Sequence, residues 1–157
     1  MVERPIDDLD RRILHSLQDD ARHTSATDIA KEADVSARTV RNRIERLEEC
    51  GIITGYNVDI DYERAGYQLH TLIVATAPIH EREEIAKRAL EVPGVVAVRE
   101  VMTGEDNVHV EVVGLDGDDL SRIGRDLNDL ELEVVDEDII RNEYTCPFAR
   151  FDVDVSE

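Results

Sequence analysis

Residues 35–51, "VSARTVRNRIERLEECG", hold the side chains best suited to chemistry with a charged partner. Four arginines fall within nine positions of a 157-residue chain whose net charge is −19: Arg38, Arg41, Arg43 and Arg46. A guanidinium can donate two parallel hydrogen bonds to a guanine edge or a phosphate, and the amide of Asn42 can pair with an adenine edge. These residue types, gathered on an otherwise acidic protein, indicate binding to a nucleic acid.

Helical periodicity divides this segment into an inner and an outer face. Val40, Ile44 and Leu47 recur at helical spacing and are expected to point into a core. The predicted DNA-binding set is the N-cap serine with the polar residues of the outer face and its flanks: Ser36, Arg38, Thr39, Arg41, Asn42, Arg43 and Arg46. The alternative is a solvated helix whose arginines pair with the glutamates nearby.

Two further helices are predicted before this one. Apolar residues recur at helical spacing over residues 7–22 and 25–33, with Asp7 and Ser25 as N-caps. Asp34 lies where the chain must turn, and Ser36 begins the third helix, which is expected to end at residue 50. A helix, a short turn and a helix that presents Arg and Asn outward are typical of a helix-turn-helix, so the predicted partner is double-stranded DNA.

The charge is distributed unevenly along the chain. Residues 1–52 hold 12 acidic and 9 basic residues, whereas residues 53–157 hold 25 acidic and 9 basic ones. This asymmetry predicts a DNA-binding domain over residues 1–52, a strand linker over 53–68 and a second domain over 69–157. The basic residues are 16 arginines and only two lysines, and an acidic, lysine-poor surface favours a halophilic source.

Several classes of protein are disfavoured by the sequence. No apolar run approaches the roughly 20 residues that span a bilayer, and the charged N-terminus does not resemble a signal peptide, so a cytoplasmic protein without a membrane partner is expected. Cys50 and Cys146 fit no metal spacing and are expected to be free thiols. No histidine ligand spacing, nucleophile–base set or glycine-rich phosphate loop is present, so we expect no metal, no cofactor and no enzymatic activity.

Strands and helices are predicted to alternate after residue 68. The expected elements are strands over 69–77, 93–102, 108–115 and 133–140, helices over 81–90 and 116–130, and a further edge strand within 147–155. The order βαββαβ is that of a ferredoxin-like domain, which makes the whole chain α+β. Because both helices would cover one face of the sheet, the other face predicts a homodimer.

The chain resembles the Lrp/AsnC, or feast/famine, family of transcription regulators from about Ile6 to Val153. The resemblance is carried by "DDLDRRILHSLQDDAR", "DIAKEADVSARTVRNRIERLEECGIITGY", "RAGY" and "TGEDN". It implies a sequence-specific DNA-binding regulator with a C-terminal RAM-type domain that binds small effectors, often amino acids. It also implies dimers that assemble further to tetramers or octamers, and with the composition it suggests a halophilic archaeon.

The resemblance places effector contacts in the turn formed by Thr103, Gly104, Glu105, Asp106 and Asn107. The family usually has an aspartate at the fifth position, where this chain has Asn107 after Asp106. A carboxylate binds an α-ammonium group more strongly than an amide does, so the turn either uses Asp106 for an effector or serves folding alone. The alternative function for the whole chain is a ferredoxin-like small-molecule-binding or enzymatic domain whose helical part mediates protein contacts.

Overall fold

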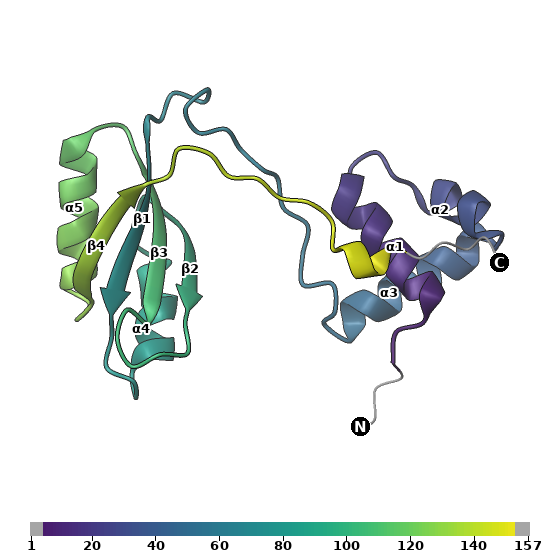
Figure 1. Ribbon diagram of the computed structural model, residues 1–157, viewed down its shortest axis with the longest axis horizontal. Coiled ribbons are helices and arrows are strands. Elements are labelled where there is room, and N and C mark those ends of the chain that lie inside the picture. The colour runs from purple at the N-terminus through teal and green to yellow at the C-terminus, as the bar shows by residue number, and fades with distance from the viewer. Residues whose placement is uncertain (1–4, 153–157) are drawn as a thin grey trace. The chain divides into compact units, whose positions relative to one another are not determined.

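The computed structural model describes residues 5–152, which form two compact units (Figure 1). Within the described residues, one unit comprises residues 5–58 and 144–152, and the other comprises residues 59–143. The predicted boundaries at residues 52 and 68 therefore differ from the observed division. The main difference is the C-terminal segment, which belongs to the helical unit rather than to the sheet.

The helical unit contains the three predicted helices, α1 (Asp8–Asp20), α2 (Ala26–Ala33) and α3 (Ala37–Glu49). Their apolar faces meet in one core of buried side chains: Ile13, Leu14, Ile29, Ala30, Val40 and Leu47. Ile44, which was also expected to point inward, packs partly buried against this core. The helical periodicity thus predicted both the helices and the faces they bury.

Short-range polar contacts fix where each helix begins. The side chains of Asp7 and Ser25 accept hydrogen bonds from the backbone N–H groups of Asp10 and Asp28, and each pair forms a complete capping box. Asp34 ends α2 in the left-handed conformation, with φ of 54°, as the predicted turn requires.

The C-terminal segment forms a short 3-10 helix, η1 (Ala149–Phe151), beside α1. Phe151 packs against the helical core, and the backbone N–H of Phe148 donates to Oε1 of Gln18 at 3.1 Å. The predicted edge strand within residues 147–155 is therefore wrong over its described part, and residues 153–155 lie outside the described residues. The packing of the Phe151 ring against the helical core stabilises this segment in place of pairing with a strand of the sheet.

Residues 53–68 were predicted to be a strand linker, but the structure assigns them no strand. Val58 and Ile60 are exposed, and the segment has no neighbouring strand in the sheet of this chain. A strand is stabilised by backbone hydrogen bonds to a neighbour, so this extended segment alone cannot form one.

The second unit follows the predicted βαββαβ order. Its elements are β1 (Leu69–Thr76), α4 (Arg82–Ala89), β2 (Val95–Glu100), β3 (Val108–Gly114), α5 (Gly117–Asn128) and β4 (Glu133–Ile139). The four strands form one antiparallel sheet in the order β2-β3-β1-β4, the arrangement of a ferredoxin-like fold.

Both α4 and α5 lie on the same face of this sheet (Figure 1). Alternate strand residues such as Ile73, Ala75 and Val110 are buried against Ile85 and Leu127 of the two helices. The residues between them, including Leu72 and Val74 on β1, point to the opposite face and are only half-buried. We call this uncovered side of the sheet the open face.

Candidate nucleic-acid interface

The start of α3 is fixed by Ser36 and Thr39. The Ser36 side chain accepts a hydrogen bond from the Thr39 backbone N–H at 3.0 Å, and the two hydroxyl oxygens lie 2.8 Å apart. The following backbone N–H groups point out of the helix N-terminus, where they can donate to a phosphate. Of the predicted set, these two residues therefore lie where a DNA backbone contact is feasible.

Arg38, Arg41 and Asn42 are exposed on one side of α3, as the periodicity predicted. In the part of the chain that the structure describes, none of the three makes an ion pair or a side-chain hydrogen bond. All their donor groups are therefore available to an outside acceptor. Two guanidinium groups and an amide in this state provide the chemistry for reading base edges and holding phosphates.

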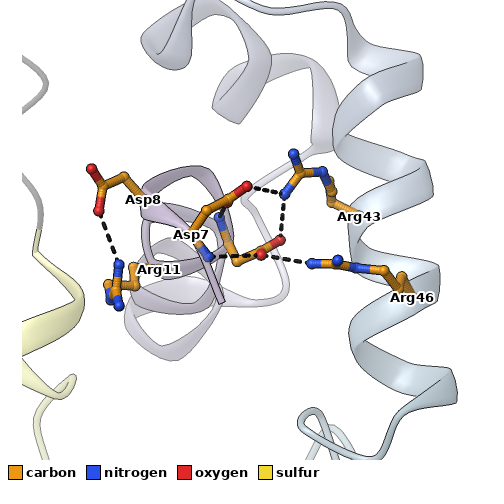
Figure 2. A network of polar contacts seen from close by, with 6 residues as sticks. Asp7, Asp8, Arg11, Arg43 and Arg46 are labelled. Carbon is orange, nitrogen blue, oxygen red and sulfur yellow. Dashed lines mark hydrogen bonds and ion pairs between the residues drawn. The ribbon is translucent and has the colours of Figure 1, made fainter. Parts of the chain in front are cut away.

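Arg43 and Arg46 lie in a different environment, because both reach from α3 toward the first turn of α1 (Figure 2). Nη1 of Arg43 lies 2.7 Å from Oδ2 of Asp7 and 3.0 Å from Oδ1 of Asp10. Nη2 of Arg46 lies 2.6 Å from Oδ2 of Asp10. The structure thus separates the predicted DNA-binding arginines into two exposed ones and two that are bound within the protein.

The four charges of this network balance one another, which makes it possible to bury Asp10 completely. Partial burial opposes ionisation of Asp7, but hydrogen bonds from the Asp10 backbone and from Arg43 outweigh it and lower the pKa of Asp7 from 3.8 to about 2. The bond to Asp7 likewise raises the pKa of Arg43 above its usual value. The network therefore links the first turn of α1 to α3 through two carboxyl and two guanidinium groups.

The role of Asp10 was not predicted from the sequence, which indicated only Asp7 as the N-cap of the first helix. A signal for it existed in the positions of Arg43 and Arg46, which are three residues apart on the flank of a helix whose core face packs toward α1. Two such arginines can together hold a buried carboxylate, because each guanidinium donates to one of its oxygens. The sequence separation of more than 30 residues concealed the pairing.

Comparisons with known proteins agree with this geometry. Residues 6–54 match the model of the winged helix-turn-helix DNA-binding family. The chain is 36% identical over 120 residues to the HTH-type transcriptional regulator LrpA of Pyrococcus horikoshii, covering 75% of this chain and 82% of the relative. It belongs to the Lrp/AsnC family of transcription regulators.

A second relative supports the same family, and a solved structure shows the same fold. The HTH-type transcriptional regulator LrpA1 of Halobacterium salinarum is 32% identical over 114 residues, which cover 73% of this chain and 79% of that protein. The fold superimposes on the structure of AsnC from E. coli with a TM-score of 0.68, covering 92% of this chain and 98% of AsnC at 24% identity. As a member of this family, the chain is a DNA-binding transcription regulator and not an enzyme.

The predicted effector turn of this Lrp/AsnC regulator lies between β2 and β3. Its first four residues are exposed, and Asp106 adopts a left-handed conformation with φ of 53° while its backbone N–H donates to the Thr76 hydroxyl at 2.9 Å. Gly104 has open space around it. These residues are accessible to a ligand.

Asn107, the fifth residue of the turn, is fully buried. Its Oδ1 accepts from the backbone N–H of Ala77 at 2.8 Å, and its Nδ2 donates to the Ala77 carbonyl at 2.9 Å. The side chain thus pairs with Ala77 as a neighbouring strand would, and it anchors the turn to the end of β1. Its polar atoms are occupied inside the protein.

Other kinds of site are not supported by the described residues. Within residues 5–152, no group of His, Cys, Asp or Glu side chains is arranged to hold a metal ion. None of the helices described is long and apolar enough to cross a membrane. Cys50 and Cys146 are both free and exposed.

Proposed function

We propose that this Lrp/AsnC regulator reads DNA with the exposed side of α3. Arg38 and Asn42 contact base edges, Arg41 binds a phosphate or a base, and the helix start at Ser36 and Thr39 binds the backbone of the DNA. The observation that carries the proposal is that Arg38, Arg41 and Asn42 are exposed and unpaired among the described residues, whereas Arg43 and Arg46 are paired. Arg43 and Arg46 then orient α3 rather than touch DNA.

The salt dependence of DNA binding separates these roles. The plot of log K against log [salt] has a negative slope, and each phosphate contact that is lost reduces the magnitude of this slope by about 0.9. Arg41→Gln is expected to lower this slope, whereas Arg43→Gln and Arg46→Gln should leave it unchanged at temperatures where the variants are folded. A slope reduced equally by all three variants would return Arg43 and Arg46 to the DNA-contacting set.

The protein is further proposed to act as a homodimer formed through the open face of the sheet, with tetramers or octamers built from dimers. Half-buried Leu72 and Val74 on an uncovered sheet support this, because apolar residues on such a face are stabilised by a second layer. The partner's helix-turn-helix would then allow a palindromic site with half-sites about 34 Å apart. Sedimentation at assay concentrations tests this, and a monomer that still binds DNA specifically would contradict it.

The turn of residues 103–107 is proposed to bind a small effector, with an amino acid as the first candidate. The exposed carboxylates of Glu105 and Asp106 could receive an ammonium group, and the open backbone at Gly104 admits close approach. Asn107 would position the turn rather than contact the ligand. Sedimentation with each of the twenty amino acids, on the wild type and on Asp106→Ala, tests this: a response lost in the variant supports it, and the absence of any response contradicts it.

The cellular setting proposed is the cytoplasm of a halophile. The acidic, lysine-poor composition supports it, because such surfaces stay hydrated in concentrated salt. Thermal unfolding with and without molar KCl tests this proposal, and full stability at low salt would contradict it.

A further inference from the structure

The chain passes between its two units twice, once after residue 58 and once after residue 143 (Figure 1). Two domains that are joined by a single linker move relative to each other by default. A second connection removes part of this freedom, to an extent that depends on its length and on how firmly its ends are held.

The first connection is held close to both of its ends. In the helical unit, the hydroxyl of Tyr56 donates to Oε1 of Glu48 on α3 at 2.7 Å. In the sheet unit, the ring of Tyr62 meets the ring of His70 edge-on, with centroids 5.1 Å apart. Residues 57–61 between these contacts are exposed, and they reach at most about 22 Å from Tyr56 to Tyr62 when fully extended.

The second connection runs from Ile140 to Phe148. The backbone N–H of Ile140 donates to the His70 carbonyl at 2.8 Å, and that of Phe148 donates to Oε1 of Gln18 on α1 at 3.1 Å. Phe151 then packs against the helical core. Among residues 5–152, no hydrogen bond holds residues 141–147, which reach at most about 29 Å from Ile140 to Phe148.

Both connections start from the same residue of the sheet unit, because one contacts the ring of His70 and the other bonds to its carbonyl. In the helical unit they are attached to different helices, α3 and α1. These two helices are joined rigidly by Asp10 and its arginines. A rigid body that is held at two separate points by two short segments cannot turn freely about either segment.

We propose that the docked C-terminal segment is a second tether, which restricts the distance and the orientations at which α3 can be presented to DNA. Gln18 and Phe151 are then positioning residues for DNA binding, although both lie outside α3. When a dimer binds two half-sites, the second helix-turn-helix binds at an effective concentration that its tethers determine, so short tethers favour one half-site spacing. This consequence rests on the dimer and the DNA contacts proposed above.

Lengthening the second connection without changing its anchors tests the tether within one chain. A Gly-Ser-Gly-Ser-Gly-Ser segment is inserted after Asn142, which is exposed. Spin labels are attached to Cys50, exposed at the end of α3, and to Arg88→Cys on α4, in a Cys146→Ser background diluted with unlabelled protein. Double electron–electron resonance should give a distance distribution about twice as broad for the insertion variant as for the protein without the insertion.

The matched control carries the same inserted segment after Asp152, beyond η1, where it lengthens the chain but not the connection. Its distance distribution should be as narrow as without the insertion. Gln18→Ala, which removes the acceptor for the Phe148 N–H, should broaden the distribution. Gln18→Glu keeps an oxygen at this position and should preserve the narrow distribution, and circular dichroism checks that each variant is folded.

The role in DNA binding is tested with palindromic duplexes in which the two half-sites of a selected site are moved apart by one or two base pairs. The wild type is expected to lose about tenfold or more in affinity when the spacing changes, and the variant lengthened after Asn142 less than about threefold. The variant lengthened after Asp152 should discriminate between the spacings as the wild type does.

The outcomes separate the tether from the dimer. Equal widths of the distance distribution with and without the insertion after Asn142 would overturn the tether, whatever the oligomeric state. A broader distribution with an unchanged spacing preference would overturn its role in DNA binding. A monomeric wild type would overturn the dimer, and the label distances within one chain would still decide the tether.

Discussion

Oδ2 of Asp10 lies 2.6 Å from Nη2 of Arg46, and this contact joins the first turn of α1 to the last turn of α3. Asp10 is fully buried, whereas the Arg46 side chain is 33% exposed. A carboxylate without access to water depends on its partners, so this pair and the bonds of Arg43 determine how α3 is held. The side of α3 that remains free is the one that we propose to bind DNA.

Asp10→Asn is expected to lower the free energy of unfolding by roughly 3 kcal/mol, because it leaves two arginines without their shared counter-charge. Chemical denaturation monitored by circular dichroism measures this. The matched control is Asp8→Asn, which breaks the exposed pair between Asp8 and Arg11 and should change stability little. Equal losses of unfolding free energy in the two variants would show that the buried network stabilises the fold no more than an exposed ion pair does.

Acid should weaken the same network through Asp7. Its pKa is lower in the folded chain, about 2, than its ordinary value of 3.8, so its stabilising effect is complete above pH 3.8 and is lost as the pH falls toward 2. Thermal unfolding of the wild type should therefore shift to lower temperature across this window. Asp7→Asn should be less stable at pH 6 and should show a smaller shift, and an unchanged shift would assign the acid sensitivity to other carboxyls.

Asn107→Asp is expected to destabilise the sheet unit by about 2 kcal/mol at neutral pH. A carboxylate can still accept from the Ala77 N–H, but it would oppose the Ala77 carbonyl, to which the Asn107 amide now donates. The loss should diminish in acid, since a protonated carboxyl can donate to that carbonyl. Asp106→Asn, at the exposed neighbour, is the control, and a stable Asn107→Asp protein at pH 7 would contradict the anchoring role.

Removal of the Phe151 ring should destabilise the helical unit, because this ring packs on the core of α1, α2 and α3. Phe151→Ala is expected to cost about 2 kcal/mol and to weaken DNA binding at temperatures near unfolding. Its ring also contacts Phe148 in an edge-to-face arrangement, with centroids 4.9 Å apart. Tyr144→Ala, at a position 88% exposed in the same segment, should have no effect, and equal stability of both variants would contradict the docking.

Much of this fold could be predicted from local sequence patterns. The capping residues Asp7, Ser25 and Ser36 and the strand that begins at residue 69 depend on neighbours a few positions away, and these predictions are confirmed. Position in the helix likewise predicted which side of α3 Arg38 and Asn42 occupy.

The features that escaped prediction depend on contacts between distant parts of the chain. Asn107 bonds to a residue 30 positions away, and Phe148 to one 130 positions away. Helical spacing placed Arg43 on the flank of α3 but could not show that Asp7 and Asp10 would meet it there. Apolar residues such as Val58 and Ile60 alternate in residues 53–68 as in a strand, but this segment pairs with none of the four strands of the described sheet.

DNA binding by the exposed side of α3 is tested most directly by selecting duplexes from a random pool with the wild-type protein and then measuring the affinity of three variants. On the selected site, Arg38→Ala and Asn42→Ala should each cost about 1–3 kcal/mol relative to a scrambled duplex and relax the sequence preference. Glu45→Ala, an exposed change on the same helix, should preserve the preference. Selection of no common sequence, or an unchanged ratio of specific to non-specific affinity in both Arg38→Ala and Asn42→Ala, would contradict the account.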